Sequence, residues 1–314
     1  MNIVLRRVGQ LTVVLFLVTV FTALLFSLLP GDLAEVSIPF GSDEQRAALR
    51  HDLGLTKPLY VQYEKWLGNF MHGDLGHFYR QGNVTPVIDR VKATAPVSLE
   101  LLIYAQVLAL AIAIPLGIYT AKHAGSFADK SVNTTAYGLL AVPDFVLALL
   151  LAYVIGVELR WLPPQGFVRW STNPGDHIRS MILPSVSLAI GQVAVYMRLL
   201  RTDLVATLQQ DFILMAKSKG ISERRVMWRH ALRPSSLTLL TAAGLNVGTL
   251  IGGAIIIERI FNLDGMGRLI FEAINERQIV AVQSLVALVA AAYVIVNFLV
   301  DILYAVLDPR IRRG

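Results

Sequence analysis

Charged side chains suited to binding a partner gather in one segment of the chain, residues 203–234. The segment carries two lysines and four arginines against three acidic residues, and long apolar runs flank it on both sides. A basic, helix-forming segment beside a membrane attracts anionic lipid headgroups or docks on a complementary protein surface. The sequence therefore points to binding at this segment, and the identity of the partner decides the function.

Patterns for catalysis and metal binding are absent from the sequence. It has no Gly-x-x-x-x-Gly-Lys-Ser/Thr loop for a nucleotide, no His-Glu-x-x-His motif and no cysteine. The histidines form no pair at a spacing of four residues; they are His51, His72, His77, His123, His177 and His230. We therefore expect no catalytic residues, no metal and no cofactor, and the chain is not expected to be an enzyme.

Six apolar blocks are expected to position the basic segment. Hydrophobic residues make up 55% of the 314 and charged residues 16%, against about 25% charged in soluble domains. Each block approaches the ~20 residues that cross a bilayer as a helix; the blocks are 9–29, 98–120, 134–156, 181–200, 236–257 and 279–306. We predict an all-α polytopic membrane protein with six transmembrane helices. The first block ends in Pro30-Gly31-Asp32 rather than a cleavage site, which indicates a retained helix.

Lysines and arginines close to the predicted spans indicate the orientation of the chain. With the N-terminus in the cytoplasm, fifteen of them lie in inner loops and termini and six in the short outer loops. Both termini and the 203–234 segment are therefore predicted to be cytoplasmic. The net charge of +6 then follows from membrane topology rather than from nucleic-acid binding.

Residues 30–97 form the longest segment predicted to lie outside the membrane. Asp43–His51 and Leu59–Met71 have helical patterns, while glycines and prolines interrupt the rest. The segment is small for an independent core, so we predict a cap on the membrane domain. The expected layout is a first helix within 1–29, an extracytoplasmic segment at 30–97 and a five-helix core at 98–314.

Prolines, glycines and acids inside the spans each allow two interpretations. Three prolines either shape a path by kinking helices or serve packing; they are Pro115, Pro143 and Pro184. Three glycines share one helix face, which suits close helix packing or a pore lining; they are Gly244, Gly248 and Gly252. Acids lie mostly at span ends, and Asp144 and Asp301 are the candidates for ion coupling.

The 203–234 segment has the pattern of two helices joined at a glycine. Apolar residues recur at helical spacing in the first half; they are Leu204, Leu208, Phe212 and Met215. Gly220 is placed to close this helix, and Ser222 to cap the next one with Glu223 in its first turn. The second helix carries three arginines on one face, namely Arg225, Arg229 and Arg233. It is predicted to end at Pro234, before the fifth span. Spacing alone slightly favours a hairpin on anionic lipid over a docking element for a soluble subunit.

Further motifs follow one another in a fixed order along nearly the whole chain. They include Leu29-Pro-Gly-Asp32, Leu53-Gly-Leu-Thr-Lys-Pro58, Gly73-Asp-Leu-Gly76, Glu258-Arg-Ile-Phe261, Asn297-Phe-Leu-Val-Asp301 and Asp308-Pro-Arg-Ile-Arg312. Together with the basic loop, they resemble the transmembrane permeases of bacterial ABC importers for dipeptides, oligopeptides and nickel. Ala216 and Gly220 stand where the EAA-type loop of that family has its alanine and glycine. The long segment after the first span is similar to that of the first of the two permease subunits.

The chain departs from the family pattern at several positions of the loop. Leu214 and Met215 replace the glutamate and the next alanine of the general pattern, and Pro234 replaces an asparagine. Leu237-Thr238 and Asp264 also differ from the family's residues. These departures bear on the geometry of the end of the loop rather than on the family.

The resemblance implies a type I ABC importer permease fold and a set of partners. They are a second homologous permease subunit in a heterodimer, two cytoplasmic ATPase subunits, an extracytoplasmic substrate-binding protein and membrane lipid, with no nucleic acid. The ATPase would hold the 203–234 loop and move it as ATP closes the ATPase pair. The residues assigned to this coupling are Asp211, Ala216, Lys219, Gly220, Glu223, Arg225 and Arg229. Candidates for the substrate path are Gln192, Tyr196 and Asn246.

Short peptides are the leading cargo under this resemblance. A dipeptide, a longer peptide, a nickel chelate and glutathione all remain open, since an external binding protein would carry much of the choice. Two other classes of protein stay as alternatives. An ion-coupled carrier would need a functional mid-span acid and no partners, and a membrane scaffold would not transport at all.

Overall fold

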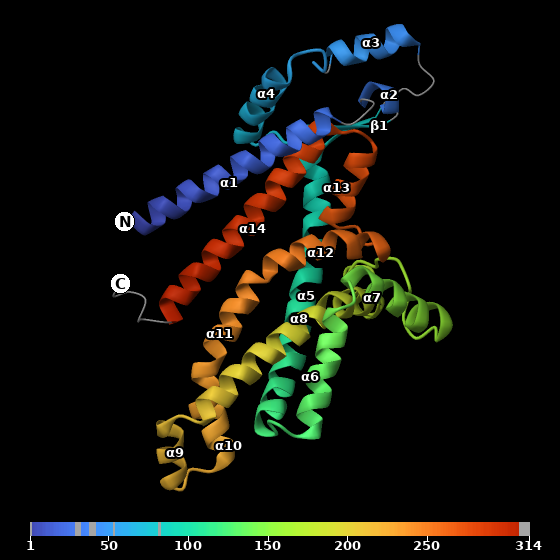
Figure 1. Cartoon of the computed structure of the whole chain (residues 1–314). Helices are drawn as coiled ribbons and strands as arrows, with labels where there is room; N and C mark the ends of the chain where they lie inside the picture. The colour runs from blue at the N-terminus through green and yellow to red at the C-terminus, as the bar shows by residue number, and fades with distance from the viewer. Residues whose placement is uncertain (1, 29–32, 38–41, 53, 81–82, 308–314) are drawn as a thin grey trace. The chain divides into compact units, whose positions relative to one another are not determined.

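The computed structural model is helical along most of its length (Figure 1). It describes residues 2–28, 33–37, 42–52, 54–80 and 83–307. In chain order the elements are α1 (Asn2–Ser27), α2 (Leu33–Ser37), α3 (Asp43–Asp52), α4 (Leu59–Met71), β1 (His77–Arg80), β2 (Asn83–Pro86), α5 (Val87–Lys122), α6 (Phe127–Leu140), α7 (Asp144–Leu151), η1 (Ala152–Glu158), α8 (Pro174–Leu208), α9 (Asp211–Ser218), α10 (Glu223–Arg225), η2 (Val226–Ala231), α11 (Leu232–Leu245), α12 (Val247–Ile260), α13 (Met266–Asn275) and α14 (Ile279–Leu307). The all-α prediction is confirmed.

The chain divides into two compact units, which are described separately. Unit 1 comprises Met1–Ser98 and Asp264–Ile295, and unit 2 comprises Leu99–Leu263 and Val296–Gly314. The long helices α5 and α14 contribute residues to both. The predicted layout of 1–29, 30–97 and 98–314 concerns position relative to a membrane, and it stays a prediction.

In unit 1, aromatic side chains of α4 join α1 to the beginning of α14. The Tyr63 hydroxyl lies 2.9 Å from the Thr19 hydroxyl of α1, and the Tyr63 ring meets Phe16 edge-on. One turn later, the buried Trp66 donates its indole N–H to Ser284 Oγ of α14 at 2.9 Å. Both helical patterns predicted in this region, Asp43–His51 and Leu59–Met71, are confirmed by α3 and α4.

A two-stranded hairpin in unit 1 lies outside the sequence prediction. β1 and β2 pair antiparallel, with Phe78 opposite Thr85. The buried Gln278 side chain binds the backbone of Tyr79 as a strand would, donating to its carbonyl at 2.6 Å and accepting from its N–H at 3.2 Å. Gly76 precedes the hairpin at φ +83°, and a Cβ there would overlap Val280. Each strand has only four residues, and alternation over so few positions gives a weak sequence signal.

In unit 2, α8 packs against α6, α7, α11 and α12 and also contacts η2. The buried residues on α8 face a continuous apolar core that also takes in α9 and η2; it includes Ala109, Ala113, Tyr196, Met197, Leu200, Leu204, Ile213, Val226, Met227 and Ala231. Small residues bring the helices close together. A Cβ on Gly117 of α5 would lie 3.2 Å from Leu200 of α8, and a Cβ on Gly244 of α11 would overlap Val300 of α14. Gly244 therefore serves close packing, whereas a Cβ on Gly252 would meet no atom within 4 Å.

The predicted third and fifth spans are not single straight helices. Phe127–Leu140 and Asp144–Glu158 meet at an angle of 99°, so the third span is broken. Pro143 explains the break, because it restricts the residue before it to extended conformations and supplies no N–H. Glu223–Leu245 and Val247–Ile260 meet at 44° around Asn246. This bend interrupts the glycine face predicted for the fifth span. Unlike Pro143, the two prolines Pro115 and Pro184 lie inside the continuous helices α5 and α8.

The lengths of the described helices bear on the six predicted spans. Among the residues that the structure describes, three helical stretches are long and apolar enough to cross a membrane as they stand, namely Val87–Lys122, Pro174–Leu208 and Ile279–Val300, and up to five if each bent pair forms one span. The apolar stretch Thr12–Ser27 of α1 is shorter. Six spans stay a prediction. The motifs at 29–32 and 308–312 and the side chain of Asp301 lie outside what the structure describes.

Candidate functional site

The basic loop (residues 203–234) begins as a continuation of α8. Leu204 is fully buried, and the helix ends at Leu208. The chain turns at Gln209 and Gln210, and α9 starts at Asp211, an exposed acid in the first turn. A negative charge there is favoured by the positive end of the helix dipole. The loop is thus attached to the core of unit 2 by the helix that forms its centre.

The turn at 209–210 overturns the apolar stripe predicted from the sequence. Because α8 and α9 are separate helices, the stripe from Leu204 to Met215 does not share one face. Ile213 and Ala216 point into the core instead, at 0% and 7% exposure. The outward face of α9 carries large apolar side chains; they are Phe212, Leu214 and Met215, at 47%, 55% and 59% exposure. An exposed apolar face beside basic residues is typical of a surface that binds another protein or a membrane.

Gly220 closes α9 as predicted. Its φ is +75°, and the Gly220 N–H bonds to the Lys217 carbonyl while the Ile221 N–H bonds to the Ala216 carbonyl. This pair of bonds is the Schellman arrangement, in which a left-handed glycine satisfies the last carbonyls of a helix. Lys219 is the exposed C-cap residue just before it. The bend of the loop is therefore built from local hydrogen bonds.

The second half of the loop differs from its prediction at both ends. Ser222 occupies the N-cap position before Glu223, but its side chain makes no capping hydrogen bond. The helix does not stop at Pro234, because helical structure runs from α10 through η2 into α11. The wide turn of η2 accommodates the proline, since the Leu232 N–H bonds five residues back to Met227 and the usual bonding pattern has shifted before Pro234 is reached.

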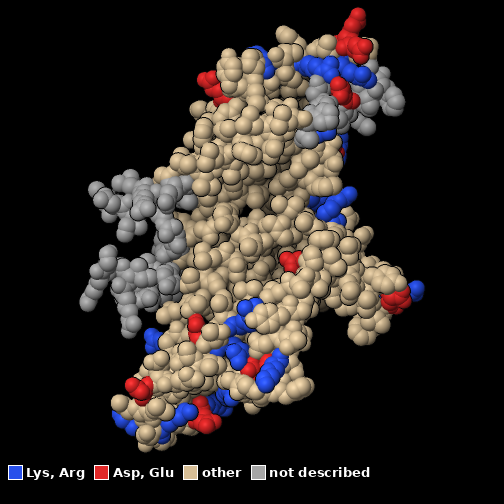
Figure 2. All heavy atoms as spheres, in the orientation of Figure 1, with Lys and Arg blue, Asp and Glu red and all other residues tan. Residues whose placement is uncertain are grey.

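Exposed arginines flank a tryptophan on this second half. Arg225 and Arg229 are exposed, Trp228 is 54% exposed, and with Arg224 and Ser222 they line one shallow depression. Figure 2 shows lysine and arginine atoms gathered at the end of unit 2 that carries α9 and α10. Val226, Met227 and Ala231 point inward and anchor the stretch to the core. Arginine and tryptophan are the residue types enriched at protein interfaces.

An ion pair at the base of the loop was missed in the sequence analysis. Arg201 of α8 binds both carboxylate oxygens of Asp129 of α6. Asp129 also accepts from the Gly125 N–H and the Asn133 amide, and the Arg201 guanidinium is the largest of the causes that hold the pKa of this carboxyl below its usual range. The readable signal was Ser126-x-x-Asp129, a capping pattern that the structure realises at the start of α6.

The three candidates for the substrate path lie near one another in unit 2. The Tyr196 hydroxyl donates to Gln106 Oε1 at 3.2 Å and has Asn246 within reach. Gln192 and Asn246 are partly exposed, whereas Tyr196 is fully buried. In this structure Tyr196 supports its polar neighbours and does not face a surface. Their role in transport stays a prediction.

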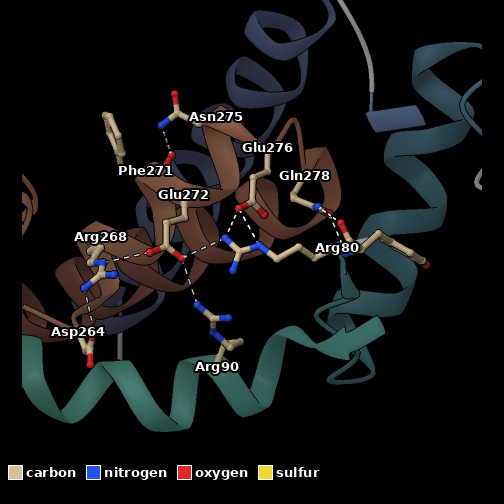
Figure 3. A network of polar contacts seen from close by, with 10 residues as sticks. Arg80, Arg90, Asp264, Arg268, Phe271, Glu272, Asn275, Glu276 and Gln278 are labelled. Atoms are coloured by element: carbon tan, nitrogen blue, oxygen red, sulfur yellow. Dashed lines mark hydrogen bonds and ion pairs between the residues drawn. The ribbon is translucent and has the colours of Figure 1, made fainter. Parts of the chain in front are cut away.

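A second concentration of charge lies in unit 1 and is paired internally (Figure 3). Glu272 of α13 binds Arg90 of α5 at 3.2 Å and Arg268 at 3.0 Å, and Arg268 also binds Asp264 at 2.9 Å. Arg80 of β1 pairs with Glu276, and this hydrogen bond is the main cause that raises the pKa of the Arg80 guanidinium. The network joins the hairpin, α5 and α13. Among the described residues no group of three His, Asp or Glu side chains is placed to hold a metal ion.

Comparison with known proteins places the chain in a family. The model for the binding-protein-dependent transport system inner membrane component matches residues 113–313, and the model for the N-terminal part of such components matches residues 1–89. A protein of Brucella abortus (strain 2308) named as a peptide transport system permease is 37% identical over 311 residues, 99% of this chain and 98% of that protein. The oligopeptide transport system permease protein AppB of Bacillus subtilis (strain 168) is 35% identical over 312 residues, 98% of each chain. The chain belongs to the family of inner-membrane components of binding-protein-dependent transport systems, the permease subunits of ABC importers.

Proposed function

We propose that this chain is the first of two permease subunits of an ATP-driven importer that takes up short peptides. The observation that carries the proposal is the construction of the basic loop. Its α9 is fixed to the core through Ile213 and Ala216 and presents Phe212, Leu214 and Met215 outward. A loop that is rigidly joined to α8 on one side and apolar on the other is suited to pass motion from a bound partner to the membrane helices.

The partners follow from the family and the chemistry of the chain. Two cytoplasmic ATPase subunits bind nucleotide, because this chain has no nucleotide loop of its own. A second homologous permease completes a heterodimer in the membrane, and an extracytoplasmic binding protein delivers the cargo to the 30–97 side. Both termini and the basic loop lie in the cytoplasm, as the distribution of lysine and arginine indicates.

The residues of the loop take distinct roles in the proposed coupling. Asp211 and Lys219 lie at the two exposed ends of α9, and Glu223 begins the next helix. Arg225 and Arg229 border the depression around Trp228 and meet acidic side chains of the ATPase. Two residues shape the loop instead of contacting the partner: Ala216 allows α9 to approach the core, and Gly220 sets the bend.

Peptide cargo rests on the relatives rather than on the loop. The proteins from Brucella abortus and Bacillus subtilis that align over nearly the full chain are named for peptide and oligopeptide transport. Unit 2 of this chain also carries amide and hydroxyl side chains on α8 and α12, at Gln192 and Thr249. Such groups match the donors and acceptors of a peptide backbone.

Co-purification and uptake test the proposal directly. We expect Gly220→Pro, Ala216→Arg and Met215→Arg each to lose the ATPase subunits while the permease still inserts in the membrane. Met215→Arg is the sharpest variant, because Met215 is exposed and the change leaves the packing of α9 intact. Lys130→Ala removes an exposed cation on α6, outside residues 203–234, and serves as the control.

The result that would reject the coupling role is retention of the ATPases by all three loop variants. Reconstituted vesicles holding the complete complex test the transport role. They should accumulate a labelled tripeptide only with ATP and the binding protein both present. Uptake driven by a proton or sodium gradient without those partners would instead identify an ion-coupled carrier.

A further inference from the structure

Asp144 occupies a cradle formed by two glycines in unit 2. It is the first residue of α7, directly after the break at Pro143. A Cβ on Gly191 of α8 would lie 3.2 Å from Asp144 Oδ1, and a Cβ on Gly253 of α12 would lie 3.8 Å from Oδ2. The carboxylate therefore rests against the backbones of two helices at points where neither has a side chain.

The charge of Asp144 has no partner that the structure identifies. The residue heads the apolar sequence Asp-Phe-Val-Leu-Ala-Leu-Leu-Leu of α7 and is exposed. Within the described ranges no ion pair or hydrogen bond to its carboxylate is found. An ionised acid among membrane helices is costly and marks a functional position by default. A cation from outside this chain is the natural complement.

A second unsatisfied acceptor lies close by on the same seam between α8 and α12. Gln192 follows Gly191 on α8 and its amide nitrogen reaches Thr249 of α12 at 3.5 Å, while its buried Oε1 has no hydrogen-bond partner. Thr249 and Gly253 are four residues apart on α12, which is about one helical turn, or 5–6 Å. The Asp144 carboxylate and the Gln192 carbonyl oxygen thus mark two levels of one seam.

We propose that Asp144 binds the N-terminal ammonium group of the transported peptide, with Gln192 Oε1 accepting a backbone N–H of the same molecule. The inference rests on the proposed function and names a recognition point within it. A peptide supplies three donors on its ammonium group and an amide N–H at each following residue, spaced by about 3.5 Å. It therefore offers a donor to each of the two acceptors along one extended chain.

A lysine or arginine of the second permease is the competing partner for Asp144. Such a side chain would neutralise the carboxylate in a fixed ion pair between subunits. The peptide fits better, because it brings donors at two successive positions of one chain to Asp144 and to the orphaned Gln192 Oε1, whereas a lysine brings its three donors to a single point.

Photo-crosslinking to the intact transporter tests the assignment without relying on the binding protein. A tripeptide carrying benzoylphenylalanine is added directly to the purified permease–ATPase complex, once with a free amino terminus and once N-acetylated. In the unsubstituted protein the free-amine form should crosslink to this chain at about tenfold lower concentration, since a charge-assisted hydrogen bond to the ammonium is lost on acetylation. Asp144→Asn should remove that preference, and Asp144→Glu should retain part of it.

Two further variants make the result specific. Asp89→Asn removes another exposed acid from the first turn of a helix, α5, and should leave the preference intact. Gly191→Ala keeps the acid but pushes its oxygen aside, so it should weaken the preference even if Asp144→Asn assembles poorly.

The outcomes separate the inference from the function on which it rests. Equal crosslinking of both peptides to the unsubstituted complex, or an equal loss of both in Asp144→Asn, would overturn the role of Asp144. Loss of the second permease on purification of Asp144→Asn, with peptide preference unchanged in Gly191→Ala, would assign the carboxylate to the subunit interface. If vesicles holding the complex of the unsubstituted protein failed to take up peptide with ATP and the binding protein present, the proposed function itself would be rejected.

Discussion

Arg201 and Asp129 form a bidentate ion pair in which both nitrogen–oxygen distances are 2.6 Å. The pair joins α8 to the start of α6, and Arg201 lies just before the basic loop begins at residue 203. Asp129 is 3% exposed, so the carboxylate is held almost entirely by protein groups. A load applied to the loop is therefore shared by two helices of unit 2.

Replacing Asp129 with asparagine should destabilise unit 2 markedly. The amide preserves the shape but leaves the Arg201 guanidinium without its counter-charge, and breaking a buried pair from one side costs about 3 kcal/mol. Arg201→Gln in the same chain should recover part of the loss, because neither charge then remains. Thermal unfolding of the detergent-purified protein, followed by the monodisperse fraction after heating, measures both effects. Equal stability of the single and double variants would show that the pair is not coupled.

Acid should act on this pair only well below neutral pH. The carboxyl has a folded pKa lowered from its ordinary value of 3.8, with the Arg201 hydrogen bond as the largest cause. A lowered folded pKa means that the stabilisation is fully present above pH 3.8 and is lost as pH falls through the folded value. The stability gap between the native protein and Asp129→Asn should thus stay constant from pH 8 to 5. A gap that closes already between pH 7 and 5 would contradict the assignment.

Substitutions of Gly220 should rank by their tolerance of positive φ. A Cβ at this position would meet no atom within 4 Å, so steric clashes do not oppose a larger residue there. The left-handed conformation at φ +75° costs a non-glycine residue about 1–2 kcal/mol, less for asparagine and more for β-branched residues. Retention of the ATPase subunits should fall in the order Gly, Asn, Ala, Val. Gly138→Ala lies inside α6, also with open space, and should be neutral or stabilising.

The sequence predicted helices and local signals better than it predicted faces. Gly220 was identifiable because a left-handed closing residue acts through its own backbone, and α4 was predicted at its observed bounds. The apolar stripe predicted for the basic loop was wrong. The turn at residues 209–210 rotates α9 relative to α8, so that Ile213 is buried and Met215 is exposed. A periodicity argument assumes one unbroken helix, and Gln209 and Gln210 are not among the residue types that usually mark a turn.

Long-range pairs were likewise outside the reach of the sequence. Asp129 and Arg201 are 72 residues apart, and single-sequence spacing carries no information at that distance. The broken third span shows the opposite case. The sequence offers Pro115, Pro143 and Pro184 as three possible kinks, and the helix breaks at Pro143 alone of the three, where α7 then packs against α8 and α12.

Gln278→Glu should turn the attachment of the β1–β2 hairpin into a pH-dependent contact. The amide both donates to and accepts from Tyr79, and an ionised carboxylate can only accept, so it would repel the Tyr79 carbonyl. The protonated acid restores the donor, which raises the folded pKa of Glu at this position above its ordinary value of about 4.3. Stability from this contact is then fully present below about pH 4.3 and is lost as pH rises through the folded value.

Trypsin cleavage after Arg80 reports whether the hairpin is attached. Arg80 is paired with Glu276 when β1 is in place and becomes available when the strand leaves. We expect cleavage of Gln278→Glu to accelerate between pH 5 and 8 beyond the enzyme's own pH dependence, which is corrected with a peptide substrate. Gln278→Leu loses both hydrogen bonds at every pH, at about 1–3 kcal/mol for each orphaned backbone group. It should therefore be cleaved rapidly throughout, and slow cleavage of this variant would show that Tyr79 does not depend on Gln278.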